Sequence, residues 1–137
     1  MTDLELTRPE TEADLDAIAG MMGWAFGPPP AEAREWFVRG GIENARLARL
    51  GAKAVGGLLE IPMGQWFGGR SVPMLGLAGV AVAPEARGKR VAWALVTHAL
   101  REARQRGIAL SALYPATLTL YRACGYEIGR ASCRERV

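Results

Sequence analysis

Hydrophobic residues in this chain alternate with polar ones in some stretches and recur at helical spacing in others. Alternation is typical of strands, whereas recurrence every three or four residues is typical of amphipathic helices. The pattern predicts elements in the order β-α-α-β-β-β-α-β-α-β. They span residues 4–8, 11–26, 31–38, 45–50, 54–63, 71–82, 88–106, 108–114 and 118–123, with a last strand beginning at Tyr126. The segment 64–70, which holds Trp66 and Phe67, is predicted to be a loop.

Local signals refine the first helix and the central strands. Thr11 followed three residues later by Asp14 predicts a capping box at the helix start. The expected buried face of this helix comprises Leu15, Ile18, Ala19, Met22 and Phe26. Gly56-Gly57 inside a strand indicates a bulge or a close backbone approach, and Gly79 is a suitable place for a bulge.

The strand over 71–82, the helix over 88–106 and the strand over 108–114 form a βαβ unit. Because such crossovers are right-handed and join parallel strands, we expect the two strands to be parallel neighbours. The chain has 137 residues, 50% of them hydrophobic and 23% charged, which is an ordinary globular composition. We therefore predict one α/β domain over residues 1–130, followed by an atypical arginine-rich tail over 131–137.

Composition and charge exclude several classes of function. Cys124, Cys133 and the single His98 are too few for a disulfide framework or a metal centre. The net charge of +3 comes largely from arginines near the end of the chain, so no nucleic-acid partner is expected. No apolar run approaches the length of a membrane span, and the N-terminus lacks the features of a signal peptide. We expect no membrane partner and a cytoplasmic location.

A short basic turn, Arg87-Gly88-Lys89-Arg90, joins the longest strand to the longest helix. The first amides of a helix have no internal partner, and the helix dipole adds partial positive charge at the same place. Together with three cationic side chains, this arrangement favours phosphate. The turn is predicted to bind the pyrophosphate of a nucleotide-like cofactor.

The residues around this turn resemble the GCN5-related N-acetyltransferase (GNAT) superfamily. Its acyl-CoA motif, Q/R-x-x-G-x-G/A, is matched at its first and last positions by Arg87 and Ala92, whereas Arg90 stands where the family usually has glycine. The run V-A-V-A-P over 80–84 and the Y-x-x-x-G-Y ending over 121–126 are also similar to the family. Within the superfamily, Ile61-Pro62-Met63, a glycine-rich turn and the run over 79–84 look most like the N-terminal domain of the enhanced-intracellular-survival (Eis) type.

This resemblance reaches to about Gly129 and implies the GNAT fold, a mixed central sheet with helices on both faces. A GNAT fold normally closes with two antiparallel strands, of which only the first begins here, at Tyr126. We therefore expect a fold that is incomplete at its C-terminus, from a truncated or frameshifted reading of a longer protein. A homo-oligomer of that longer protein is left open.

The implied activity is direct transfer of an acetyl group from acetyl-CoA to a primary amine of an aminoglycoside, polyamine or lysine-like acceptor. The strands over 71–82 and 108–114 must then separate so that the pantetheine can lie between them, and backbone amides must polarise the thioester. Tyr121 is the implied general acid, because a phenol stays protonated at neutral pH and can protonate the leaving thiolate. The implied cofactor-binding residues are Val80, Ala81, Val82, Arg87, Gly88, Lys89, Arg90, Val91, Ala92, Trp93, Ala116 and Thr117.

Several assignments stay open at this stage. A residue at a helix start does not need a positive φ, so the Arg90 side chain either points away or, as we favour, pairs with a phosphate. Trp24, Phe26 and Trp36 could line an acceptor pocket, although helix-spaced aromatics more often belong to the core. Eis-type enzymes are understood to use their own C-terminal carboxylate as the base, and here a solvated Glu60 is the favoured reading over a catalytic one.

Two other functional classes compete with the transferase. A CoA-binding or interaction module without turnover would fit a chain that lacks the C-terminal catalytic part. A phosphate-binding domain for another nucleotide would fit the basic turn alone.

Overall fold

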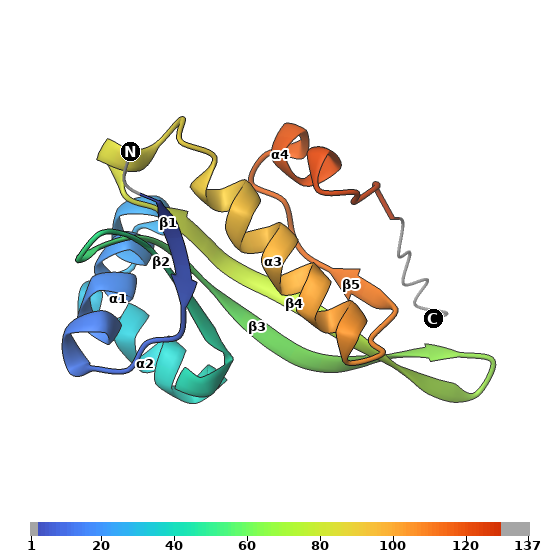
Figure 1. Ribbon diagram of the computed structural model, residues 1–137. Helices are drawn as coiled ribbons and strands as arrows, with labels where there is room; N and C mark the ends of the chain where they lie inside the picture. Colours follow the sequence, from blue (N-terminus) through green and yellow to red (C-terminus); the bar gives the residue numbers. More distant parts are fainter. Residues whose placement is uncertain (1–2, 130–137) are drawn as a thin grey trace.

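A five-stranded mixed sheet in the order β1-β2-β3-β4-β5 runs through the protein (Figure 1). The structure is a computed structural model, and it describes residues 3–129. Strands β1 to β4 pair with their sequence neighbours in antiparallel fashion, and β5 pairs with β4 in parallel. The parallel pairing predicted for the βαβ unit is confirmed. The strands are β1 (Leu4–Thr7), β2 (Ala45–Leu50), β3 (Lys53–Phe67), β4 (Arg70–Val82) and β5 (Leu110–Ala112).

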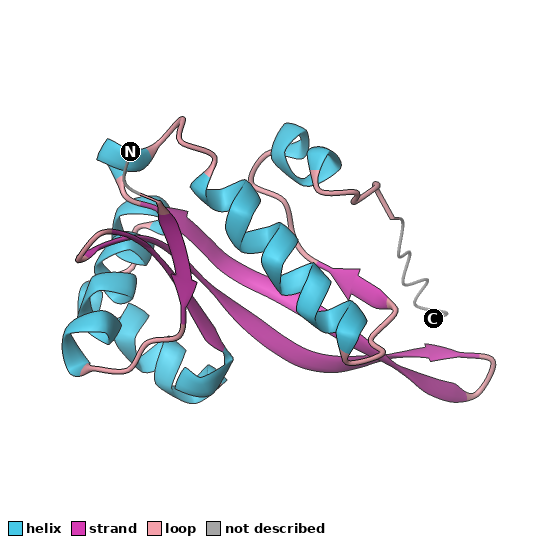
Figure 2. Cartoon of the chain, viewed as in Figure 1, coloured by secondary structure: helices cyan, strands magenta, loops and turns pink. Residues whose placement is uncertain are grey.

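Helices cover both faces of this sheet (Figure 2). Gly56 and Gly57 show which helix lies on which face, because neighbouring residues of a strand point to opposite sides. A Cβ on Gly56 would lie 2.6 Å from Val91 Cγ1, and one on Gly57 would meet Ile18. The predicted close approach is therefore confirmed on both faces at once. The helices and 3₁₀ turns are α1 (Glu12–Phe26), α2 (Pro30–Gly40), η1 (Ile42–Asn44), η2 (Pro84–Ala86), α3 (Val91–Gln105) and α4 (Leu118–Ala123).

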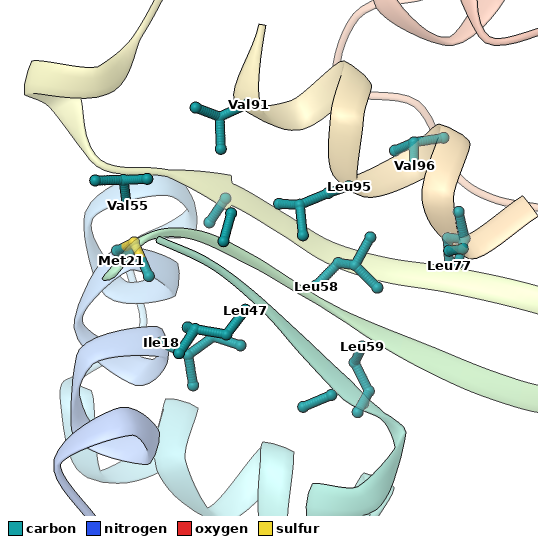
Figure 3. Packing of buried hydrophobic residues seen from close by; sticks show 14 of the residues in the cluster. Ile18, Met21, Leu47, Val55, Leu58, Leu59, Leu77, Val91, Leu95 and Val96 are labelled. Atoms are coloured by element: carbon teal, nitrogen blue, oxygen red, sulfur yellow. The ribbon is translucent and has the colours of Figure 1, made fainter. Parts of the chain in front are cut away.

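The hydrophobic core lies on the two sides of β2, β3 and β4 (Figure 3). Ile18 and Leu47 pack on the side of α1, and Leu58, Val91 and Leu95 pack on the side of α3. Each of these side chains is almost completely removed from water. At roughly 1.5–3 kcal/mol for each large apolar side chain, this burial is the main force that fixes the helices against the sheet.

The start of α1 confirms the predicted capping box. The Asp14 amide donates to Thr11 Oγ1 over 3.1 Å, and the Thr11 amide donates back to the Asp14 carboxylate over 3.2 Å. The predicted buried face of α1 is partly wrong, since Met22 is only half-buried and Phe26 is half-exposed, whereas Met21 and Asp14 are buried. Asp14 is accommodated there because it accepts backbone hydrogen bonds and pairs with Arg49 on β2.

The predicted loop over 64–70 is wrong. Strand β3 continues to Phe67 and β4 begins at Arg70, so the two form a long hairpin arm that extends beyond the rest of the sheet (Figure 1). Gly68 and Gly69 make the turn, with φ of +54° and +79°. Two consecutive residues with positive φ match the twist of a two-residue hairpin, so these glycines connect two strands instead of interrupting them.

Further differences from the predicted elements lie in the C-terminal half. Helix α3 begins at Val91 and not at Gly88, and β5 is limited to Leu110–Ala112. Residues 126–128 do not form a strand. A strand needs a partner strand, and among the described residues none lies beside this segment. The predicted tail over 131–137 lies outside the described residues.

Candidate active site

Strands β4 and β5 pair over a short distance and then part. Their register runs only from Met74 opposite Leu110 to Gly76 opposite Ala112, yet β4 continues to Val82. Within residues 3–129, the edge of β4 beyond Gly76 on the β5 side has no partner strand. The unpaired edge includes the predicted thioester site over 80–82, and it offers backbone groups to an extended ligand.

A bulge lies just before this site, as predicted. Gly57 is opposite Ala81 and Leu59 is opposite Ala78, so β4 contains one extra residue between these pairs. Gly79 within the bulge has a φ of +60°, which glycine adopts without steric cost.

Trp36 lies directly against the bulge. Its ring carbons are 3.0 Å from the position that a Cβ on Gly79 would occupy. The ring is held edge-on by Phe37, with 5.0 Å between the two ring centroids. Trp24 and Phe26 are 80% and 50% exposed at the end of α1. Of the three aromatic residues predicted for the acceptor side, Trp36 thus contacts the bulge.

The turn between β4 and α3 leaves several amides without a protein acceptor. Within the described chain, the amides of Gly88 and of residues 90–93 donate no hydrogen bond, and the first helical bond runs from Ala94 to the Arg90 carbonyl over 3.0 Å. The side chains over 87–90 are exposed. Free amides at a helix start beside three cationic side chains are suited to an anion.

Arg90 adopts a conformation that the sequence reading did not anticipate. Its φ is +60°, which makes it the sole non-glycine residue with a positive φ in the part of the chain that the structure describes. The assumption that a positive φ is not needed here is therefore wrong, and the family's glycine at this position has a physical reason. The guanidinium lies 4.4 Å from the centroid of the Trp93 ring, a cation–π contact that helps to hold the strained residue.

Tyr121 is positioned by the end of the short helix α4. Gly125, with a φ of +99°, lets the Tyr126 amide donate to the Tyr121 carbonyl over 3.0 Å, and the Gly125 amide donates to the Arg122 carbonyl. This is a Schellman motif, and it explains physically the spacing of the Y-x-x-x-G-Y segment. The Tyr121 ring is 7% exposed and meets the Tyr126 ring edge-on. Burial raises the pKa of Tyr121, so its hydroxyl keeps the proton that a general acid needs.

Ala116 and Thr117 are exposed in the segment that leads from β5 into α4, where Thr117 is the N-cap residue. The favoured interpretation of Glu60 as a solvated glutamate is wrong. Its side chain is buried in a cluster with Arg46 and Arg106 on the α3 face of the sheet. Because arginines contact both of its carboxylate oxygens and the side chain is removed from solvent, Glu60 is not accessible to an acceptor amine.

A cavity of the described chain lies apart from the basic turn. It has a volume of about 750 Å³ and lies between the hairpin arm, β5 and α4. Tyr121 is the one predicted site residue that lines it. Among residues 3–129, no group of three or more histidine, cysteine, aspartate or glutamate side chains is placed to hold a metal ion. The described helices also include none with the length and apolar character needed to cross a membrane.

Comparison with known proteins decides the family. Residues 7–129 match the family model of the acetyltransferase (GNAT) domain. The chain belongs to the GNAT family. A search of curated proteins finds no match.

Solved structures of GNAT proteins resemble most of this chain. A GCN5-related N-acetyltransferase from Kribbella flavida is 40% identical with a TM-score of 0.78, and one from Anabaena variabilis ATCC 29413 is 38% identical with a TM-score of 0.76. Each match covers 88% of this chain but only 32% and 31% of those proteins, so the chain spans about a third of their length. AAC(6')-Iy, solved with the bisubstrate analogue CoA-S-monomethyl-acetylneamine, is 17% identical with a TM-score of 0.76 over 98% of both chains, and it supports the fold alone.

Two sets of contacts in this GNAT domain could not be predicted from its sequence. The contact of Trp36 with Gly79 joins a helix to a strand far away in the chain. The hydrogen bonds of Ser111, which donates to the Leu75 carbonyl over 2.8 Å and also contacts the Tyr126 hydroxyl, join three segments. No local signal marks either contact, although the position of Tyr126 at the end of the Y-x-x-x-G-Y segment was visible.

Proposed function

We propose that this GNAT domain binds acetyl-CoA and transfers its acetyl group directly to a primary amine. The observation that carries the proposal is the pair of unsatisfied backbone surfaces on one βαβ unit. The amides of Gly88 and of residues 90–93 suit a pyrophosphate, and the unpaired edge of β4 suits an extended pantetheine. A ligand that satisfies both must combine a phosphate group with a chain that can lie like a strand.

In the proposed reaction the neutral amine attacks the thioester carbonyl carbon while amides over 80–82 polarise the carbonyl oxygen. A C–N bond forms, the C–S bond breaks, and the sulfur leaves with its electron pair. The Tyr121 hydroxyl gives its proton to that sulfur, and the amine loses a proton to solvent. The buried, protonated state of Tyr121 supports this role.

We further propose Trp36 as a wall of the acceptor site. Its ring lies against the bulge that precedes the thioester position, and its indole face can attract a cationic acceptor through a cation–π interaction. Polyamines, aminoglycosides and lysine-like amines share that cationic chemistry. Trp24 and Phe26, exposed on the same helical region, are the next candidates.

A CoA-binding module without turnover is the second candidate. The observation that favours it is the position of Glu60, which is sequestered by arginines and leaves the amine without this carboxylate as a base. The two candidates share the cofactor site and differ only in chemistry.

The test combines calorimetric binding of acetyl-CoA with release of free thiol in the presence of polyamine and aminoglycoside panels. We expect micromolar binding, together with acceptor-dependent thiol release. Lys89→Ala should weaken binding, whereas Arg101→Ala, which removes a similarly exposed cation farther along α3, should not. Binding without thiol release would favour the module, and absence of binding would refute both candidates.

The Eis-type affiliation and the truncation also belong to the proposal. Two relatives near 40% identity are about three times as long as the matched segment, which supports a domain that operates within a longer protein. Sequencing the gene beyond the codon for Val137 tests this, and the mass of the native protein tests homo-oligomer formation. The cytoplasmic location stays a prediction, which cell fractionation can check.

A further inference from the structure

Three segments meet at the point where β4 and β5 part. Ser111 on β5 is opposite Leu75 on β4, one residue before the last pair of the parallel register. The Ser111 hydroxyl donates to the Leu75 carbonyl over 2.8 Å and also contacts the Tyr126 hydroxyl. Because a carbonyl only accepts and a serine hydroxyl has one proton, Tyr126 must be the donor to Ser111.

The Tyr126 end of this chain of hydrogen bonds is held firmly. Its amide belongs to the Schellman motif that ends α4, and its ring meets the Tyr121 ring edge-on with 6.1 Å between centroids. Burial raises the pKa of Tyr126, so the phenol keeps the proton that it donates. The end of α4 is therefore joined through two hydroxyls to the backbone of β4.

This connection is placed where the sheet is weakest. Strand β5 is short, and parallel pairing is slightly less stable per residue than antiparallel pairing. In the described chain, the other side of β5 has no strand. A side-chain clamp at Ser111 adds directional bonds to a junction that backbone pairing alone holds poorly.

We propose that the Tyr126 hydroxyl, acting through Ser111, fixes the point at which β4 and β5 separate, and that Tyr126 is thereby a positioning residue for the pantetheine part of an acyl-CoA. The inference rests on the proposed acetyl-CoA site and adds a residue with no direct contact to the reacting atoms. It also connects the junction to Tyr121, since both tyrosines share one helix end.

Loss of the clamp should affect the two parts of the cofactor differently. The basic turn over 87–90 binds the diphosphate end, and within residues 3–129 it forms no hydrogen bond with Ser111 or Tyr126. Loss of the clamp should therefore weaken binding of the pantetheine end and leave the diphosphate end unaffected.

The test compares binding of CoA and of 3′-phosphoadenosine 5′-diphosphate, which lacks pantetheine. Tyr126→Phe and Ser111→Ala should each raise the Kd for CoA about three- to tenfold, the effect of one hydrogen bond, and leave the Kd for the diphosphate unchanged. The double variant should raise the Kd for CoA no more than either single variant does, because both substitutions remove the same connection between Tyr126 and β4. Tyr114→Phe is the matched control, since Tyr114 is a fully exposed tyrosine on the same cavity.

A second measurement needs no ligand. Hydrogen exchange of the amides in β5 should be faster in Tyr126→Phe and Ser111→Ala than in the wild type or Tyr114→Phe. Unchanged exchange, or equal losses for CoA and the diphosphate, would overturn the clamp. If the wild type failed to bind CoA, the proposed function would fall, and the exchange result would still decide whether the clamp exists.

Discussion

Replacing Gly79 with alanine tests the link between the bulge and Trp36. Gly79 has a φ of +60°, and a Cβ there would lie 3.0 Å from two ring carbons of Trp36. A left-handed conformation costs a non-glycine residue about 1–2 kcal/mol. Forcing a methyl group against a packed ring adds roughly 1–3 kcal/mol, because the ring must move or the strand must shift. We expect Gly79→Ala to lower the free energy of unfolding by about 2–5 kcal/mol.

Gly68→Ala supplies the matched control for this substitution. Gly68 has a φ of +54° and no atom within 4 Å of a Cβ built on it. It therefore carries the conformational cost without the collision, and we expect a loss of about 1–2 kcal/mol. The difference between the two variants measures the contact with Trp36.

Urea unfolding followed by circular dichroism gives both free energies. In a Trp36→Leu background, the cost of Gly79→Ala should fall towards that of Gly68→Ala, since the shorter side chain leaves room for the methyl group. Equal costs for Gly79→Ala and Gly68→Ala in the wild-type background would refute the packing argument. The acetyl-CoA affinity of Gly79→Ala, measured in the folded variant, then shows whether the bulge also shapes the proposed thioester site.

Three further substitutions test single residues. Arg90→Gly relieves a strained φ and removes the stack on Trp93, so we expect the free energy of unfolding to change by less than about 1 kcal/mol. Unchanged or tighter CoA binding by this variant would mean that Arg90 is not a phosphate ligand. A clear loss of CoA affinity would mean that it is one. The pKa of Asp14 is lowered to about 2 from 3.8, first by the hydrogen bond from the Glu10 amide and also by Arg49. A carboxyl group whose pKa is lower in the folded protein stabilises the fold at pH values above its pKa in the unfolded chain, so this contribution should be lost as the pH falls from about 4 to 2. The free energy of unfolding of Asp14→Asn should therefore depend less on pH in that range. Tyr121→Phe should reduce thiol release roughly 10²–10⁴-fold with little change in the Kd for acetyl-CoA, and a rate within twofold of the wild type would remove Tyr121 as the acid.

The secondary structure was predictable wherever local signals decide it. The capping box at Thr11, the parallel βαβ unit and the bulge at Gly79 all follow from short-range patterns and general rules of chain geometry. The hairpin arm was not predicted because the pair Gly68-Gly69 is compatible with two different backbone structures. Glycine pairs occur both in irregular loops and in two-residue turns, and only the pairing of β3 with β4 distinguishes them.

Some features of the candidate site are likewise predictable from local sequence, and others are not. The basic turn and Tyr121 belong to compact motifs whose geometry depends on neighbours in sequence, such as the Schellman motif at Gly125. The burial of Glu60 was missed because its partners, Arg46 on β2 and Arg106 just after α3, lie far away in the chain. A solvated glutamate and a buried ion pair look alike in a one-dimensional pattern.

The sequence by itself determined the order of elements as far as α4, the placement of a basic turn between a strand and a helix, and the resemblance to the GNAT family. These depend on hydrophobic period, on breakers and on short motifs, all of which act over a few residues. Only the tertiary structure decided that Trp36 lies on the Gly79 bulge, that Arg90 is left-handed and stacked on Trp93, and that Tyr126 reaches β4 through Ser111. Such contacts arise when packing brings separate surfaces together, or holds a residue in a conformation that its own preferences disfavour.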